Sequence, residues 1–138
     1  MERFAMQKLA EWKEKNGRKP LIIRGARQVG KTWIMKEFGK RYFEQVAYVN
    51  FDSNVRMQQV FEGELDIERI ILALSIETGI SIKAENTLLI FDEVQEVPKA
   101  LISLKYFYEN APEYAIVAAG SLLGVALHRG TSFPVGKV

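Results

Sequence analysis

Cysteine is absent from this 138-residue sequence, and histidine occurs only once. Without cysteine, the chain can form neither disulfide bonds nor metal sites that depend on thiolate ligands. The single histidine, His128, has no metal-ligand or catalytic-triad partners in view, so we assign it no role. The lack of cysteine fits a reducing compartment, and we therefore expect a cytoplasmic protein.

The sequence also has little excess of positive over negative charge, and it lacks long apolar runs. The net charge of +2 is too weak to favour nucleic acid or an anionic membrane as a partner. No apolar run approaches the roughly 20 residues that span a bilayer, and the N-terminus lacks the apolar core of a signal peptide. A hydrophobic content of 48% is ordinary for a globular protein. The length fits one domain that buries about two-thirds of its unfolded surface.

What the sequence does contain is a phosphate-binding pattern. Residues 25–32 read GARQVGKT and match G-x-x-x-x-G-K-[ST], the Walker A motif. The apolar run 20–24 before it predicts a buried strand, and residues 32–42 after it place apolar side chains on one helical face. This is the strand–loop–helix context in which the motif binds phosphate. The alternative is a glycine-containing turn with an incidental lysine.

The chemistry of phosphate binding explains why these residue types occur at these positions of the motif. Glycines let the backbone adopt positive φ and approach a ligand closely, so that the loop N–H groups form an anion-binding nest at the positive end of a helix. Lys31 would reach the β- and γ-phosphates, and the Thr32 hydroxyl would ligate Mg²⁺. Arg27 either faces the phosphates or is solvated. The residues assigned to nucleotide binding here are Gly25, Ala26, Arg27, Gln28, Val29, Gly30, Lys31 and Thr32.

A second motif follows some 60 residues later. The continuously apolar run 87–91 predicts a strand covered on both faces, and Asp92 and Glu93 come directly after it. This is a Walker B pattern, in which Asp92 would hold Mg²⁺ through water, opposite Thr32. Glu93 would orient and polarise the water that attacks the γ-phosphate. Acidic residues are also common at solvated strand ends, but the preceding phosphate loop favours the magnesium site.

Three further residues have weaker claims to a role. Ser121 follows a predicted strand at 114–119. Many ATPases with a phosphate-binding loop keep a polar residue at this place that senses the γ-phosphate. Serine at this position is equally a natural N-cap of a following helix. Arg129 is a candidate arginine finger, acting in cis or on a neighbouring subunit. Trp33 fits helix packing better than stacking on adenine.

Strands and helices alternate along the chain, which predicts an α/β domain with a parallel sheet and helices on both faces. Ligands bind at the carboxyl ends of such strands, where the phosphate loop, Asp92-Glu93 and Ser121 would converge. The segment 55–64 is ambiguous, irregular or weakly helical. The predicted strands are 21–24, 46–51, 87–91 and 114–119, and the predicted helices are 3–16, 32–42, 67–78, 99–110 and 122–127.

The last residues, 133–138, look like a turn leading into another strand that is cut as it begins. We therefore expect a truncated chain, with its last core strand missing. Residues 1–138 would form one ATPase core, in which the N-terminal helix 3–16 precedes a nucleotide-binding core at 20–138.

Five segments resemble a prokaryotic AAA-type ATPase family that carries a C-terminal domain of unknown function. The Arg-Gln-x-Gly-Lys-Thr loop and the Phe-Asp-Glu-x-Gln segment are more distinctive than generic Walker motifs, and the resemblance runs through essentially the whole chain. The segments are 25–32, 48–51, 89–95, 119–124 and 132–136.

The resemblance implies a three-layer P-loop NTPase core of the AAA/ASCE type, with strand order 5-1-4-3-2, that binds and hydrolyses Mg-ATP. Lys31, Thr32, Asp92 and Glu93 would fill the roles argued above, and Ser121 would occupy the sensor position. Family members continue into a last core strand and the C-terminal domain. A protein or nucleic-acid partner would bind through that missing region. Ring or dimer assembly is common in the wider class, and no residue pattern here marks a subunit interface.

The absence of three motifs argues against three other classes of nucleotide-binding protein. No Asn-Lys-x-Asp motif is present to favour a GTPase, no Leu-Ser-Gly-Gly-Gln stretch to favour a transporter, and no arginine-rich lid typical of metabolite kinases. The leading hypothesis is a Mg²⁺-dependent ATPase in which Glu93 and Lys31 are catalytic. The alternative is a nucleotide-gated protein or nucleic-acid binding module with little hydrolysis. A metabolite kinase, the third hypothesis, would consume ATP only when an acceptor is added.

Overall fold

The computed structural model describes residues 2–23, 30–120 and 136–137. Its sheet has five strands in the order β2-β3-β4-β1-β5, and every neighbouring pair is parallel. Read from the other edge, this is the order 5-1-4-3-2 that the resemblance implied, and the predicted α/β fold with a parallel sheet is confirmed. The strands are β1 (Leu21–Ile23), β2 (Gln45–Asn50), β3 (Thr87–Asp92), β4 (Ala115–Ala119) and β5 (Gly136–Lys137).

The strand β5 lies at the edge of the sheet beside β1. Leu21 is in register with Gly136, and Ile22 with Lys137. The strand that the sequence analysis expected to be missing is therefore represented by two residues. A parallel ladder with β1 needs only backbone groups, so this short pairing forms without the long apolar run that marks the central strands.

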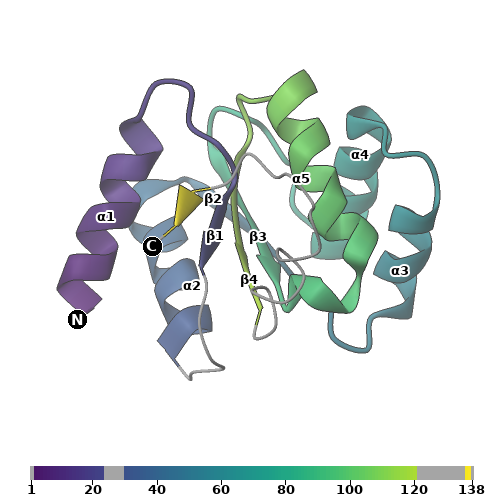
Figure 1. Cartoon of the computed structure of the whole chain (residues 1–138), viewed down its shortest axis with the longest axis horizontal. Coiled ribbons are helices and arrows are strands. Elements are labelled where there is room, and N and C mark those ends of the chain that lie inside the picture. The colour runs from purple at the N-terminus through teal and green to yellow at the C-terminus, as the bar shows by residue number, and fades with distance from the viewer. Residues whose placement is uncertain (1, 24–29, 121–135, 138) are drawn as a thin grey trace.

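Helices cover both faces of the sheet, as the right-handed crossover rule predicts. In Figure 1, α1 and α2 lie on one face, and α3, α4 and α5 lie on the other. The predicted helix 122–127 lies outside the described residues, and the other predicted elements agree with the observed ones to within two residues. The helices are α1 (Glu2–Glu14), α2 (Gly30–Tyr42), α3 (Val55–Glu62), α4 (Ile67–Thr78) and α5 (Pro98–Asn110).

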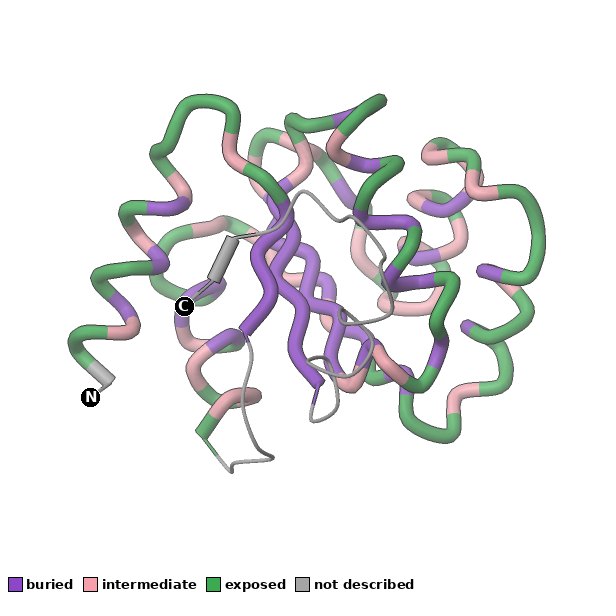
Figure 2. The backbone as a smooth tube through the Cα atoms, viewed as in Figure 1, coloured by how far each residue is buried: buried purple, intermediate pink, exposed green. Residues whose placement is uncertain are grey.

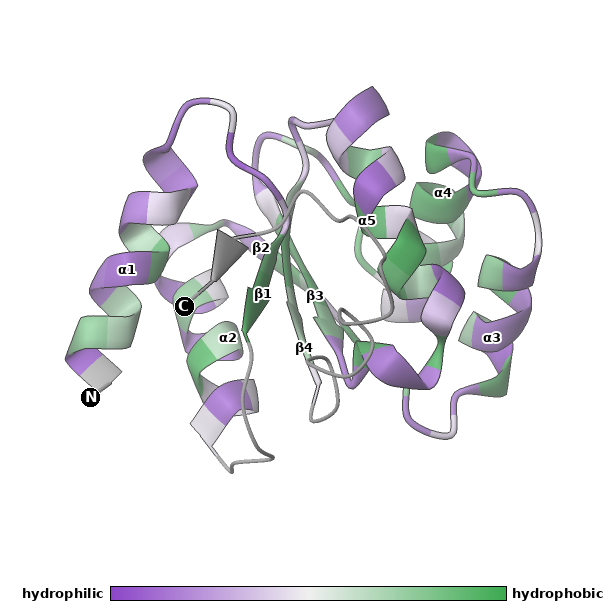
Figure 3. Cartoon of the chain, in the orientation of Figure 1, coloured by the Kyte–Doolittle hydropathy of each residue, from purple (hydrophilic) through white to green (hydrophobic). Residues whose placement is uncertain are grey.

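Two cores form because side chains alternate across each strand. Along β3, Leu88 and Ile90 join the core under α1 and α2, whereas Leu89 and Phe91 join the core under α3, α4 and α5. Figure 2 shows the central strands buried along their length, and Figure 3 shows hydrophobic residues concentrated on them. A strand covered on both faces is apolar at most positions, and this is why residues 88–91 of β3 and 115–119 of β4 read as continuous hydrophobic runs.

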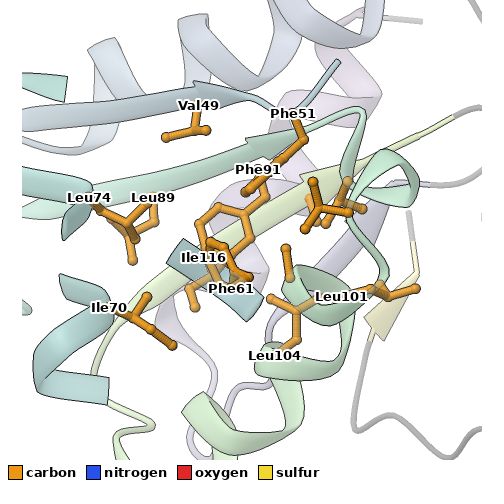
Figure 4. Close-up of a cluster of buried hydrophobic side chains, with 14 of the residues drawn as sticks. Val49, Phe51, Phe61, Ile70, Leu74, Leu89, Phe91, Leu101, Leu104 and Ile116 are labelled. Carbon is orange, nitrogen blue, oxygen red and sulfur yellow. The ribbon is translucent and has the colours of Figure 1, made fainter. Parts of the chain in front are cut away.

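Aromatic side chains anchor β3 close to its carboxyl end. The Phe91 ring lies between Phe51 and Phe107, with ring centroids 5.3 Å and 6.5 Å away, and Phe61 is 6.2 Å away. All three contacts are edge-to-face, the geometry that adds about 0.5–1.5 kcal/mol per pair beyond burial of area. Figure 4 shows Phe51, Phe61 and Phe91 of this cluster. Phe91 directly precedes Asp92, so the cluster fixes the backbone from which that carboxylate projects.

Local capping chemistry sets the ends of α3 and α4. The Asp66 side chain accepts a hydrogen bond from the Arg69 N–H at 3.0 Å, and Gly79 ends α4 in the left-handed conformation with φ 74°. Aspartate is a favoured N-cap residue and glycine the favoured residue for a left-handed helix end, so both ends of the predicted helix 67–78 have local signals. The ambiguous segment 55–64 contains the helix α3, which is capped by Asn54 through its 3.1 Å hydrogen bond to the Met57 N–H.

The helix α2 lies unusually close to the sheet at Gly39. A Cβ atom at this position would overlap the side chain of Val46 and would lie 3.2 Å from Leu88. Glycine therefore permits the close approach of α2 to β2 and β3. Because the helix is rigid, this contact also sets the position of its first turn, which holds Lys31 and Thr32.

Candidate functional site

The carboxyl ends of four strands lie in one row across the sheet. Asn50 is in register with Asp92, Asp92 with Ala119, and Ala119 with Ile23. In the sequence, the phosphate loop follows Ile23 and Ser121 follows Ala119 by two positions. Parallel sheets of this type bind ligands at this edge, outside the carboxyl ends of the strands.

The Asp92 carboxylate lies at the centre of this row and is only 5% exposed. Its Oδ2 atom accepts a hydrogen bond from the Thr32 hydroxyl at 2.7 Å and another from the Tyr48 hydroxyl at 2.7 Å. Its Oδ1 atom accepts one from the Glu93 backbone N–H at 3.0 Å. Residues 60 positions apart in sequence, Thr32 and Asp92, are thus in direct contact.

The oxygens of Thr32 and Asp92 fit a magnesium ion. Hydroxyl and carboxylate oxygens are hard ligands of the kind that Mg²⁺ prefers, and Mg²⁺ in nucleotide sites is usually held by one or two such groups together with water and phosphates. Thr32 lies in the first turn of α2, a 13-residue helix whose first turn contains no acidic residue. The positive end of this helix therefore favours an anion at the same place.

Tyr48 belongs to the same hydrogen-bond network. Burial raises the pKa of its phenol well above the usual value, and the hydrogen bond to Asp92 and the negative charge of Asp92 raise it further. The hydroxyl therefore stays protonated and remains a donor at neutral pH. The Lys36 ammonium lies 4.1 Å from the centroid of the Tyr48 ring, a cation–π contact that holds the ring on its other side.

Glu93 has a backbone conformation that side-chain-bearing residues seldom adopt. Its φ of 52° and ψ of 44° place it in the left-handed region, which costs about 1–3 kcal/mol and occurs most often at functional sites. Its carboxylate accepts a hydrogen bond from the Gln95 amide at 2.8 Å, and its N–H is bonded to Asp92. A short 3₁₀ turn, η1 (Val94–Glu96), follows directly.

The amide oxygen of Gln95 is buried and has no hydrogen-bond partner within the part of the chain that the structure describes. Buried polar atoms are usually paired, so an orphan beside a proposed catalytic carboxylate calls for an explanation.

The structure therefore brings together Thr32, Asp92 and Glu93, with Gly30 and Lys31 beginning α2 beside them. Sequence reasoning gave no role to Tyr48 or Gln95, although both lie in segments that resemble the ATPase family. The predicted residues Gly25, Ala26, Arg27, Gln28, Val29, Ser121 and Arg129 lie outside the described residues, as does His128.

Trp33 lies away from this network. It is 47% exposed and lines a groove of about 930 Å³ between α1 and α2, together with Met6 and Tyr42. The groove contains none of the oxygen ligands described above. The size of this groove does not make it the better candidate site, because Asp92 and Glu93 do not line it.

Two observations concern the rest of the molecule. Among residues 2–23, 30–120 and 136–137, no helix is both long and apolar enough to span a membrane. The same residues contain no cluster of three or more histidine, cysteine or acidic side chains that could hold a metal ion, so a magnesium ion here would depend on Thr32, Asp92, water and phosphate.

Comparison with known proteins identifies the family of this chain. A family model described as an AAA domain matches residues 17–138, which is most of the chain. A search of curated proteins finds no match. AAA domains are P-loop ATPases that typically bind ATP together with Mg²⁺, and the parallel sheet of this chain is consistent with their fold. On the strength of this match, the chain belongs to the AAA domain family.

Proposed function

We propose that this chain is the core of a Mg²⁺-dependent ATPase that binds and hydrolyses ATP to drive a protein or nucleic-acid partner. The observation that carries the proposal is the 2.7 Å hydrogen bond between Thr32 and Asp92, which joins the Walker A and Walker B motifs. Residues 1–138 act as one unit in this proposal, with α1 packed beside α2 through Met6, Leu9 and Trp12 in their shared core.

Each predicted residue has a distinct task. The backbone of residues 25–30 would bind the phosphates, and Lys31 would neutralise charge that develops on the γ-phosphate. Thr32 and Asp92 would hold Mg²⁺, which when bound polarises the phosphate oxygens. Ser121 would contact the γ-phosphate as a sensor.

Glu93 would act as the base. Its carboxylate lies one residue beyond Asp92 and is held on one oxygen by the Gln95 amide. This carboxylate would accept a hydrogen bond from the attacking water and then its proton. Gln95 would direct the same water through its buried amide oxygen.

The first test compares Glu93→Gln and Lys31→Ala with the wild type. Calorimetry with Mg-ATP measures binding, and phosphate release measures turnover. Glu93→Gln should bind ATP normally but lose turnover about 100-fold or more, the usual contribution of a general base. Lys31→Ala should lose binding. Trp33 follows Thr32 directly, so its fluorescence offers a second readout of binding. Undiminished turnover in Glu93→Gln would exclude Glu93 as the base.

A nucleotide-gated binding module is the second candidate. The hydrogen bond from Gln95 to Glu93 favours it, because the carboxylate oxygen that accepts this bond has one acceptor position fewer for the attacking water. This candidate predicts that partner affinity differs between the ATP-analogue and ADP states while phosphate release stays negligible. An affinity that is equal in both states would rule it out.

A further inference from the structure

We propose that Tyr48 is a positioning residue for the magnesium site, and that its hydroxyl fixes the orientation of the Asp92 carboxylate. This inference rests on the proposed function and adds a residue on β2 to a site otherwise built from α2 and β3. No role follows for Tyr48 from the Walker motifs, because it belongs to neither.

The argument begins with the hydrogen bonds that Asp92 accepts. An ionised carboxylate has about four acceptor positions, two on each oxygen. The hydroxyls of Thr32 and Tyr48 occupy Oδ2, and the Glu93 N–H occupies one position on Oδ1. Three bonds from three directions fix the plane of the carboxylate. The acceptor position that remains on Oδ1 therefore has a defined direction, toward which a metal-bound water can donate.

Thr32 and Tyr48 hold the same oxygen but differ in what else they do. As a magnesium ligand, Thr32 would use its oxygen lone pair for the ion while its hydrogen still points to Asp92. Tyr48 is not a magnesium ligand in this proposal: its hydroxyl donates to Asp92 and also interacts with the side chains of Asn50 and Thr32, so it is held in place beside the carboxylate. Carboxylates that bind metals are commonly held by such outer partners, whose loss costs about 10–100-fold in metal affinity.

The position of Tyr48 is itself well fixed. On β2 it is in register with Ile90 of β3, two residues before Asp92. Its ring contacts the core under α1 and α2 and lies 4.1 Å from the ammonium of Lys36, which is one turn after Thr32 on α2. Tyr48 thus ties β2 to both elements that supply the magnesium ligands. A change in the position of α2 would reach Asp92 through this side chain as well as through Thr32.

The test measures metal binding directly, without turnover. Mn²⁺ replaces Mg²⁺ and is titrated into protein saturated with ADP, while electron paramagnetic resonance counts the free ion. Tyr48→Phe removes only the hydroxyl and keeps the ring and its contact with Lys36. We expect the Mn²⁺ dissociation constant to rise about tenfold or more, while ADP binding without metal stays within about twofold of the wild type.

The control is Tyr106→Phe, the same chemical change at a partly exposed position on α5. It should leave the Mn²⁺ dissociation constant unchanged. If Tyr48→Phe also leaves it unchanged, or tightens Mn²⁺ binding, the inference is overturned while the proposed function stands. A wild-type protein that binds no Mn²⁺ in the presence of ADP would contradict both together.

Discussion

A single buried carboxylate, Asp92, accepts hydrogen bonds from three different elements of the fold. Thr32 lies on α2, Tyr48 on β2, and the Glu93 N–H at the end of β3. Burying a charged group is costly unless it is hydrogen-bonded, and here each carboxylate oxygen has at least one donor. The consequence for function is that Asp92 and Glu93 are positioned together, because the bond to Oδ1 also constrains the backbone of Glu93.

Gln95 offers a test at this scale. Gln95→Leu removes the amide that holds the Glu93 carboxylate at 2.8 Å. A hydrogen bond to a charged group contributes about 1.5–3 kcal/mol, so turnover should fall roughly tenfold or more, while ATP affinity changes by less than about twofold. Steady-state phosphate release and calorimetry measure the two quantities.

The matched control for this change is Gln58→Leu on α3, an exposed glutamine on the far face of the sheet from α2. It should leave both turnover and ATP affinity as they are in the wild type. Equal turnover in Gln95→Leu and Gln58→Leu would show that Glu93 does not depend on Gln95.

The sequence predicted some residues of this site and not others. Thr32 and Asp92 each lie in a recognisable motif, so their meeting at one sheet edge followed once the strands were taken as parallel. The contact of Tyr48 with Asp92 could not be predicted from the sequence. It depends on the register between β2 and β3, and no local pattern encodes that register. Gln95 was missed because its reach to Glu93 depends on the left-handed conformation of Glu93.

The helices show the same division between local and tertiary information. The helix α4, predicted at 67–78, has local signals at both ends, because Asp66 caps its start and Gly79 ends it. The helix α3 has eight residues, of which only Met57 and Phe61 are buried. A pattern this short does not distinguish a helix from an irregular segment when only one sequence is used. Its stability comes from packing against the aromatic cluster around Phe91.

Gly39 gives a prediction about the packing of α2 on the sheet. Alanine is the better helix former by about 1 kcal/mol, yet its Cβ would overlap the Val46 side chain. Overpacking of this kind typically costs about 1–3 kcal/mol, so Gly39→Ala should lower the free energy of unfolding or leave it barely changed, never raise it by the helix-propensity gain. Urea unfolding followed by circular dichroism measures the change.

A second substitution separates steric overlap from other effects. Val46→Ala removes the atom that the new Cβ would meet, so the double variant should be more stable than the sum of the two single changes predicts. Additive losses would show that α2 does not rely on Gly39 for its distance from β2 and β3. Nucleotide affinity of Gly39→Ala then reports how far that distance matters for Thr32.

On the scale of the whole molecule, the site joins parts of the chain that otherwise meet only through the sheet. Thr32 and Tyr48 lie near one another on the side of α1 and α2, whereas the aromatic cluster that anchors Asp92 lies on the side of α3, α4 and α5. A ligand bound by Thr32 and Asp92 would therefore depend on residues that are positioned by both halves of the core. Ligand binding should therefore raise the midpoint of the global unfolding transition and not only stabilise one loop.

This coupling can be measured by thermal unfolding. A ligand at 100 times its dissociation constant that binds only the folded state stabilises it by about 2.7 kcal/mol, which for a domain of this size raises the unfolding midpoint by roughly 5–10 °C. Mg-ADP should produce such a shift in the wild-type protein and none in Lys31→Ala. Because Asp92 would hold the ion in the proposed function, Asp92→Asn should respond to ADP but not to added Mg²⁺. An equal shift in the wild type and Lys31→Ala would place the nucleotide at another part of the molecule.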